Sequence, residues 1–124
     1  MRLGIKSAQF YSYHGVKTEE QTLGGRYEVD LDLFYDSTEA VINDDVQIAV
    51  NYEEAFFCIE EAISGESYNL IETLAREILN MAMDRFPLLV KATARVRKMN
   101  VPMHHVVSFI EAEQTLTRIQ NDKH

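Results

Sequence analysis

Two stretches of the chain alternate between apolar and polar residues with a period of two, the pattern of a β-strand that buries one face. The first stretch alternates Tyr27, Val29, Leu31, Leu33 and Tyr35 with Glu28, Asp30 and Asp32. The second stretch alternates Val90, Ala92, Ala94 and Val96 with Lys91, Thr93, Arg95 and Arg97. Both predict strands whose apolar faces join one core and whose charged faces lie opposite that core.

Two further strands are predicted near the ends of the chain, where the alternation is less regular. One runs from Leu3 to Tyr13 and ends at His14-Gly15, and the other runs from about Val106 to Arg118. The segments 16–25 and 37–45 are mainly polar. We expect both of these segments to be loops rather than regular elements.

Two helices are predicted between the second and third strands. Asn51 can cap a helix from Tyr52 to Ile63, because asparagine accepts hydrogen bonds from the free N–H groups of a first turn. Asn69 can cap a longer helix that continues to about Arg85 and stops before Pro87. The apolar residues near one face of this longer helix are Leu70, Leu74, Ile78 and Met81.

The predicted order is β-β-α-α-β-β, an α+β fold in which two helices cover one face of a four-stranded antiparallel sheet. The uncovered face carries acidic residues on one strand and basic residues on its neighbour, which attract each other across the strands. Neither candidate edge strand is interrupted by proline, so both edges are open to pairing with another chain. We therefore expect several subunits to join their sheets, most simply into a closed barrel.

Length and composition narrow the class of protein. The chain has 124 residues, of which 46% are apolar, which fits one domain over residues 1–118 and a flexible tail over 119–124. A net charge of −8 disfavours binding to nucleic acid or to an anionic membrane surface. The chain begins without the apolar run of a signal peptide, and no stretch approaches the about 18 apolar residues that span a bilayer. We expect a cytoplasmic protein, in which the single cysteine, Cys58, is buried and inert.

Two side chains stand out as candidates for chemistry. Glu72 falls in the first turn of the second predicted helix, where a fixed carboxylate can bind a flat heterocycle that carries two adjacent N–H donors. An alternative role for Glu72 is a capping box with Asn69, because the two residues have that spacing. Lys98 ends the third predicted strand and is a candidate proton carrier, although a solvated lysine is the commoner outcome at such a position.

Several segments together resemble the dihydroneopterin aldolase family. They are Tyr13-His14-Gly15-Val16 with Glu20, then Gly25, Val50-Asn51-Tyr52, Tyr68 to Ala75, and Val96 to Pro102. The resemblance spans nearly the whole chain and implies the tunnelling fold, in which β-β-α-α-β-β subunits form a barrel as a tetrameric ring or an octamer. The chain departs from the family at Met103-His104-His105, where relatives usually have a turn with glycine.

The resemblance implies a reaction of folate biosynthesis. The family cleaves 7,8-dihydroneopterin into 6-hydroxymethyl-7,8-dihydropterin and glycolaldehyde, and many members also epimerise the side chain at C2′. The C6=N5 imine of the substrate serves as the electron sink, so no metal, no cofactor and no lysine Schiff base is implied. The expected partners are therefore the pterin substrate and further copies of the chain.

The resemblance also implies roles for particular residues. Glu72 would anchor the pterin ring, and Lys98 would act as the general acid and base. Tyr52 would reach the substrate from a neighbouring subunit. Glu20 would assist Lys98 through water, with Glu19 as a rival for that role. The pocket would be lined by Val16, Val50, Asn51 and Ile71, whereas His14 would be structural.

Three other functions remain open at this point. A dihydroneopterin triphosphate 2′-epimerase would share the ring anchor but bind a triphosphate, which suits an acidic chain less well. Zinc-dependent pterin enzymes of the same fold need histidine and cysteine ligands, and the histidines and Cys58 of this chain have no such spacing. A non-catalytic pterin- or purine-binding module would need Glu72 but not Lys98.

Overall fold

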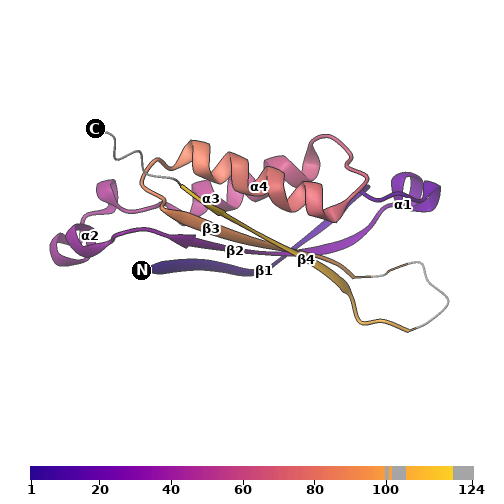
Figure 1. Cartoon of the computed structure of the whole chain (residues 1–124), viewed down its shortest axis with the longest axis horizontal. Coiled ribbons are helices and arrows are strands. Elements are labelled where there is room, and N and C mark those ends of the chain that lie inside the picture. Colours follow the sequence, from indigo (N-terminus) through magenta and orange to yellow (C-terminus); the bar gives the residue numbers. More distant parts are fainter. Residues whose placement is uncertain (100, 102–105, 119–124) are drawn as a thin grey trace.

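The computed structural model describes residues 1–99, 101 and 106–118, and its elements follow the predicted β-β-α-α-β-β order with three short helices added (Figure 1). The strands are β1 (Arg2–Ser12), β2 (Gly25–Phe34), β3 (Lys91–Lys98) and β4 (Ile110–Thr117). The two long helices are α3 (Tyr52–Ser64) and α4 (Ile71–Arg85). The short ones are α1 (Thr18–Leu23), α2 (Thr38–Asn43) and the 3₁₀ turn η1 (Val46–Ile48). The expected tail 119–124 and the Met103-His104-His105 segment lie outside the described residues.

The four strands form one antiparallel sheet in the order β1-β2-β3-β4. Helices α3 and α4 lie on the same face of this sheet, and α1 and α2 lie at its opposite ends (Figure 1). The pairing of β2 with β3 places Tyr27 opposite Lys98. The end of β3 therefore meets the start of β2, close to α1.

The core lies between this sheet and the two long helices. Val29, Leu31 and Leu33 of β2 are fully buried against the helices, together with Leu74 and Ile78 of α4. Burial of each such side chain stabilises the fold by about 1.5–3 kcal/mol. Cys58 is buried among them with 5% of its surface exposed, as predicted, and burial raises the pKa of its thiol.

Some sequence predictions were wrong in detail. Helix α4 begins at Ile71 with Leu70 as its N-cap, so Leu70 is 48% exposed and Ile71 occupies the buried position. Val90 lies just before β3 and is 45% exposed, although its N–H still donates to the Phe34 carbonyl at 2.9 Å. Strand β4 begins at Ile110 rather than near Val106. Helix α1 escaped prediction because it has no buried residue and hence no apolar period.

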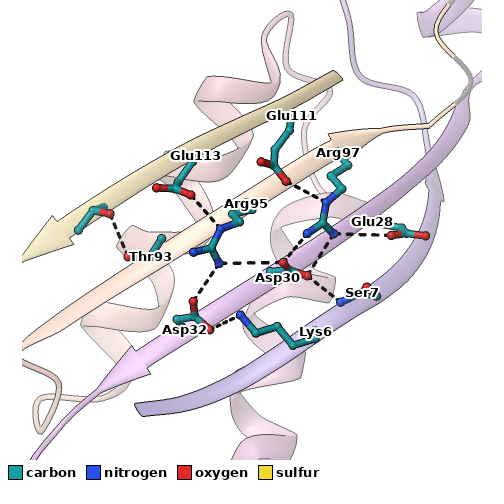
Figure 2. A network of polar contacts seen from close by, with 11 residues as sticks. Lys6, Ser7, Glu28, Asp30, Asp32, Thr93, Arg95, Arg97, Glu111 and Glu113 are labelled. Carbon is teal, nitrogen blue, oxygen red and sulfur yellow. Dashed lines mark hydrogen bonds and ion pairs between the residues drawn. The ribbon is translucent and has the colours of Figure 1, made fainter. Parts of the chain in front are cut away.

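The uncovered face of the sheet carries a network of ion pairs, as the sequence predicted (Figure 2). Arg95 donates to Asp32 at 2.9 Å and Arg97 donates to Asp30 at 3.1 Å, both across the β2–β3 pair. Burial alone would raise the pKa of both aspartates, but the hydrogen bonds from their basic partners outweigh burial and lower it. Lys91 shares the side of β3 with Arg95 and Arg97, as predicted, but its ammonium group lies 4.8 Å from the centre of the Phe34 ring rather than beside an acidic residue.

Among the described residues, none of the helices has the length and apolar character needed to cross a membrane.

Candidate active site

The Tyr13-His14-Gly15-Val16 segment is held against the connection between α3 and α4 by hydrogen bonds. His14 is only 1% exposed, and its Nδ1 accepts from the backbone N–H of Tyr68 at 2.9 Å. That bond leaves Nε2 as the N–H that donates to the Ile63 carbonyl at 2.8 Å. Burial lowers the pKa of His14, so the ring stays neutral. His14 is therefore a structural residue, as predicted, and it fixes the segment next to the start of α4.

Gly15 allows the carboxylate of Glu20 to fold back over the chain. Its φ of +131° is a conformation that only glycine adopts readily. A Cβ atom at this position would also lie 2.5 Å from Cδ of Glu20. The glycine of the motif thus serves both the turn and the placement of Glu20.

Glu20 of α1 and Lys98 at the end of β3 form an ion pair, with Lys98 Nζ 2.7 Å from Glu20 Oε2. Their side chains are only 11% and 18% exposed. Burial alone would raise the pKa of Glu20, but hydrogen bonds from Lys98 and from the Lys17 backbone outweigh burial and lower it. The structure thus places Glu20 beside Lys98, and the two side chains are in direct contact rather than at the distance of a bridging water.

A cavity of about 400 Å³ lies beside this ion pair, at the end of the sheet where α4 begins. Its lining includes five of the predicted site residues, which are Val16, Glu20, Ile71, Glu72 and Lys98. Strand β4 completes the wall with Ile110, Glu111 and Ala112. The size and the mixture of apolar walls with a few charged groups are typical of a small-molecule site.

The first turn of α4 presents Glu72 to this cavity without a capping box. Leu70 is the N-cap and makes no side-chain cap, so the first N–H groups of the helix have no such acceptor. Asn69 instead accepts a hydrogen bond from Gln21 at 3.3 Å. Within the described part of the chain, no hydrogen bond or ion pair holds the Glu72 carboxylate. That carboxylate can therefore accept hydrogen bonds from a ligand.

Three predicted site residues, Tyr52, Val50 and Asn51, do not line this cavity. Tyr52 is 66% exposed and lies with Ile5 of β1, at the sheet edge opposite β4. Val50 is buried, and its N–H donates to the Tyr35 hydroxyl. Asn51 caps α3 by accepting from the N–H groups of Glu53 and Glu54, as predicted. A single chain thus holds five of the eight predicted residues in one place.

Glu20 and Lys98 also line a second cavity, of about 160 Å³. The other lining residues are Glu19, Leu23, Gly24, Gly25, Arg26 and Tyr27. Sequence reasoning missed this cavity, because Arg26 and Gly25 reach Lys98 only through the pairing of β2 with β3. The one sequence feature that could have indicated this cavity is Gly24-Gly25, just before the alternating strand.

Within the described ranges, no group of three or more histidine, cysteine, aspartate or glutamate side chains is arranged to hold a metal ion. Both ring nitrogens of His14 are already engaged with backbone groups. Cys58 lies on α3 within the core.

Comparisons with known proteins agree with the motifs. The profile of the family described as dihydroneopterin aldolase matches residues 3–115. A Bacillus subtilis dihydroneopterin aldolase is 35% identical over 80% of this chain and 82% of its own length. The enzyme of the same name from Streptococcus pyogenes serotype M18 is 33% identical over 91% of this chain and 97% of its own length.

Solved structures agree in fold. The Escherichia coli dihydroneopterin aldolase in complex with neopterin superposes with a TM-score of 0.80 at 19% identity, covering 92% of this chain and 98% of that one. A Burkholderia dihydroneopterin aldolase bound to guanine gives a TM-score of 0.77 at 16% identity, covering 96% and 92%. The extent of the profile match and the identity to the curated relatives place this protein in the dihydroneopterin aldolase family.

Proposed function

We propose that this protein is the dihydroneopterin aldolase of folate biosynthesis, which cleaves 7,8-dihydroneopterin into 6-hydroxymethyl-7,8-dihydropterin and glycolaldehyde. The observation that carries the proposal is the meeting of Glu72, Glu20 and Lys98 around one cavity. These residues come from α4, α1 and β3, which are far apart in the sequence. A carboxylate for the ring and an ion pair for the side chain are the two parts that the reaction requires.

The pterin ring is bound by the carboxylate of Glu72. The ring carries an N–H beside an amino group, and a carboxylate can accept two parallel hydrogen bonds from such a pair. The uncapped first turn of α4 adds N–H donors for the ring oxygen and nitrogen atoms. The apolar side chains of Val16 and Ile71 provide walls for a flat ring. Neopterin and guanine, the ligands of the two relatives described above, share this donor pair.

Cleavage needs proton transfer rather than a covalent intermediate. Removal of the proton from the C2′ hydroxyl turns C2′ into an aldehyde carbon as the C1′–C2′ bond breaks, and the electron pair moves through C6 onto N5. A proton then adds to C1′, which restores the C6=N5 imine and gives the hydroxymethyl product. Lys98 carries these protons, and Glu20 holds its amine in place through the 2.7 Å contact.

A second subunit completes the site. The main cavity opens at β4, whereas Tyr52 lies beside β1, and these strands are the two edges of the sheet. Pairing of the β4 edge of one subunit with the β1 edge of the next would bring Tyr52 of the neighbour to the cavity. This closed ring of sheets would also remove both unpaired edges. Val50 and Asn51 precede Tyr52 and would enter the same interface.

The proposal is tested with two variants and two assays. Lys98→Ala is expected to lower turnover by orders of magnitude while pterin binding changes little. Glu72→Ala is expected to weaken binding strongly, because the paired donors of the ring lose their acceptor. Glu39→Ala on α2, at the other end of the sheet, is the matched control and should change neither quantity. Normal pterin binding by Glu72→Ala would contradict the anchor.

The same assay tests independence from metals and Schiff bases. Turnover of 7,8-dihydroneopterin should persist in the presence of a chelator, and borohydride should trap no adduct on Lys98. Turnover of the triphosphate should be slower than turnover of the free substrate. Cell fractionation tests the expected cytoplasmic location. Loss of activity in chelator with recovery in zinc would replace the proposed electron sink with a metal.

A further inference from the structure

The Glu20–Lys98 ion pair lines two cavities, and the reaction described above uses only one of them. The larger cavity contains Glu72 and accounts for the ring. The smaller cavity, of about 160 Å³, is bounded by Glu19 and Leu23 of α1 and by the first residues of β2. Because Lys98 lines both cavities, a substrate whose ring lies against Glu72 and whose side chain reaches Lys98 can extend its far end into this second space.

We propose that the smaller cavity is a subsite for the two-carbon hydroxyaldehyde that the reaction releases. This inference rests on the proposed function. The ring and C1′ occupy the larger cavity, C2′ lies next to Lys98, and C2′ and C3′ with their oxygens occupy the smaller one. When the C1′–C2′ bond breaks, the proton of the C2′ hydroxyl leaves to the base and the electron pair stays with the pterin. The neutral aldehyde is left in the smaller cavity.

The size and polarity of this cavity suit such a fragment. Glycolaldehyde has four non-hydrogen atoms, and about 160 Å³ is room for a few water-sized groups. Its oxygens need hydrogen-bond donors, of which Lys98 is one, and its hydroxyl hydrogen needs an acceptor such as Glu19. The Tyr27 hydroxyl is already used, because it donates to the His14 carbonyl at 2.5 Å.

Gly25 offers a way to fill the cavity without disturbing its walls. Alternate residues of a strand face the same side, so a side chain at Gly25 points to the same side of β2 as Tyr27. A Cβ atom at Gly25 meets no other atom within 4 Å, and Gly25 lines the cavity. Gly25→Val should therefore reduce the volume of the smaller cavity while leaving the larger cavity intact.

The test is the reverse reaction, in which 6-hydroxymethyl-7,8-dihydropterin and glycolaldehyde condense. Gly25→Val is expected to raise the KM for glycolaldehyde by at least about tenfold, since lost contacts of about 1.4 kcal/mol correspond to that factor. The Kd for 6-hydroxymethyl-7,8-dihydropterin, measured by fluorescence, should stay within about twofold of the unaltered protein. Leu23→Ala should act in the opposite sense and improve condensation with the three-carbon glyceraldehyde relative to glycolaldehyde. Ile42→Phe, an exposed position on α2, adds bulk elsewhere and should change none of these values.

Each outcome decides one question. If the unaltered protein neither cleaves nor condenses the pterin, the proposed function fails. If the unaltered protein is active but Gly25→Val keeps its KM for glycolaldehyde, only the subsite is wrong. A parallel rise in the Kd for the pterin would mean that Gly25 supports the whole site, and this result would also overturn the subsite. Leu23→Ala still tests the subsite if Gly25→Val folds poorly, because an unchanged preference between the two aldehydes contradicts it.

Discussion

At the scale of single residues, the site depends on groups that do no chemistry themselves. The His14 ring is fixed as one tautomer by two backbone groups, the Tyr68 N–H and the Ile63 carbonyl. The Tyr27 hydroxyl and the Gln21 side chain hold the carbonyl groups of His14 and Gly15. These bonds keep the chain before α1 in place, and the position of Glu20 follows from them.

His14 predicts a dependence of stability on pH. Its pKa is lowered from the ordinary value of 6.5, so the unfolded chain binds a proton at this residue more readily than the folded chain. Stability is therefore complete above about pH 6.5 and is lost as the pH falls from there toward the lowered pKa, by at most about 1.4 kcal/mol per pH unit. Urea unfolding between pH 8 and pH 5 measures this slope.

The control for this prediction is His14→Asn, which removes the titrating ring. The variant should be less stable at pH 8 because buried hydrogen bonds are lost. It should also show a shallower decline between pH 7 and pH 5 than the unaltered protein. An equal slope in both proteins would assign the pH dependence to other groups.

At the scale of elements, the sequence predicted those parts whose pattern is repeated and missed those set by single contacts. Strands β2 and β3 and helix α3 follow from alternation and from a cap, and the structure confirms them. The start of α4 was predicted one residue early because Asn69 binds Gln21, a residue 48 positions away, rather than capping its own helix. Helices α1 and α2 have six residues each and too little apolar surface to produce a period.

Asn51 allows a test at the scale of elements, because two roles were predicted for it. One role is to cap helix α3, and the other is to line the pocket. Asn51→Ala removes the acceptor of the Glu53 and Glu54 N–H groups and is expected to cost about 1 kcal/mol of unfolding free energy. Asn51→Ser keeps a capping oxygen and should restore most of that stability. Thermal unfolding and turnover are measured for both variants.

Turnover separates the two roles of Asn51. If the side chain only caps α3, Asn51→Ser should cleave 7,8-dihydroneopterin at the rate of the unaltered protein. A serine variant that is stable but slow would instead place the asparagine side chain against the substrate.

At the scale of the whole molecule, the predicted site residues fall into two groups at opposite edges of the sheet. Glu72 and Lys98 lie near the β4 edge, whereas Tyr52 lies near the β1 edge. A sequence pattern within one chain cannot show how two edges approach each other, which is why Tyr52 was assigned through family resemblance alone. The smaller cavity was missed for a related reason, because strand pairing rather than sequence spacing brings Arg26 to Lys98.

This division of the site predicts complementation between inactive variants. Lys98→Ala and Tyr52→Ala should each be nearly inactive when assembled alone. In a mixture that has been dissociated and reassembled, about one site in four combines an intact Lys98 with an intact Tyr52 of the neighbour. Turnover should then recover to about a quarter of the unaltered rate.

The matching control is a mixture of Lys98→Ala with Glu72→Ala, whose altered residues lie in the same cavity. No chain in that mixture carries both intact residues, so activity should stay low. Recovery in this control, or none in the first mixture, would contradict a site shared between subunits.

Arg118, just past β4, donates to the backbone carbonyls of Met83, Phe86 and Leu89 at 2.8, 3.2 and 2.8 Å. These carbonyls belong to the last turn of α4 and to the loop that follows it, where a helix leaves its acceptors unpaired. One guanidinium group thus ties the final strand to the far end of the helix that carries Glu72 at its start. Fraying of the sheet at this corner would release both elements together, so the helix end and the strand should exchange their amide hydrogens as one cooperative unit.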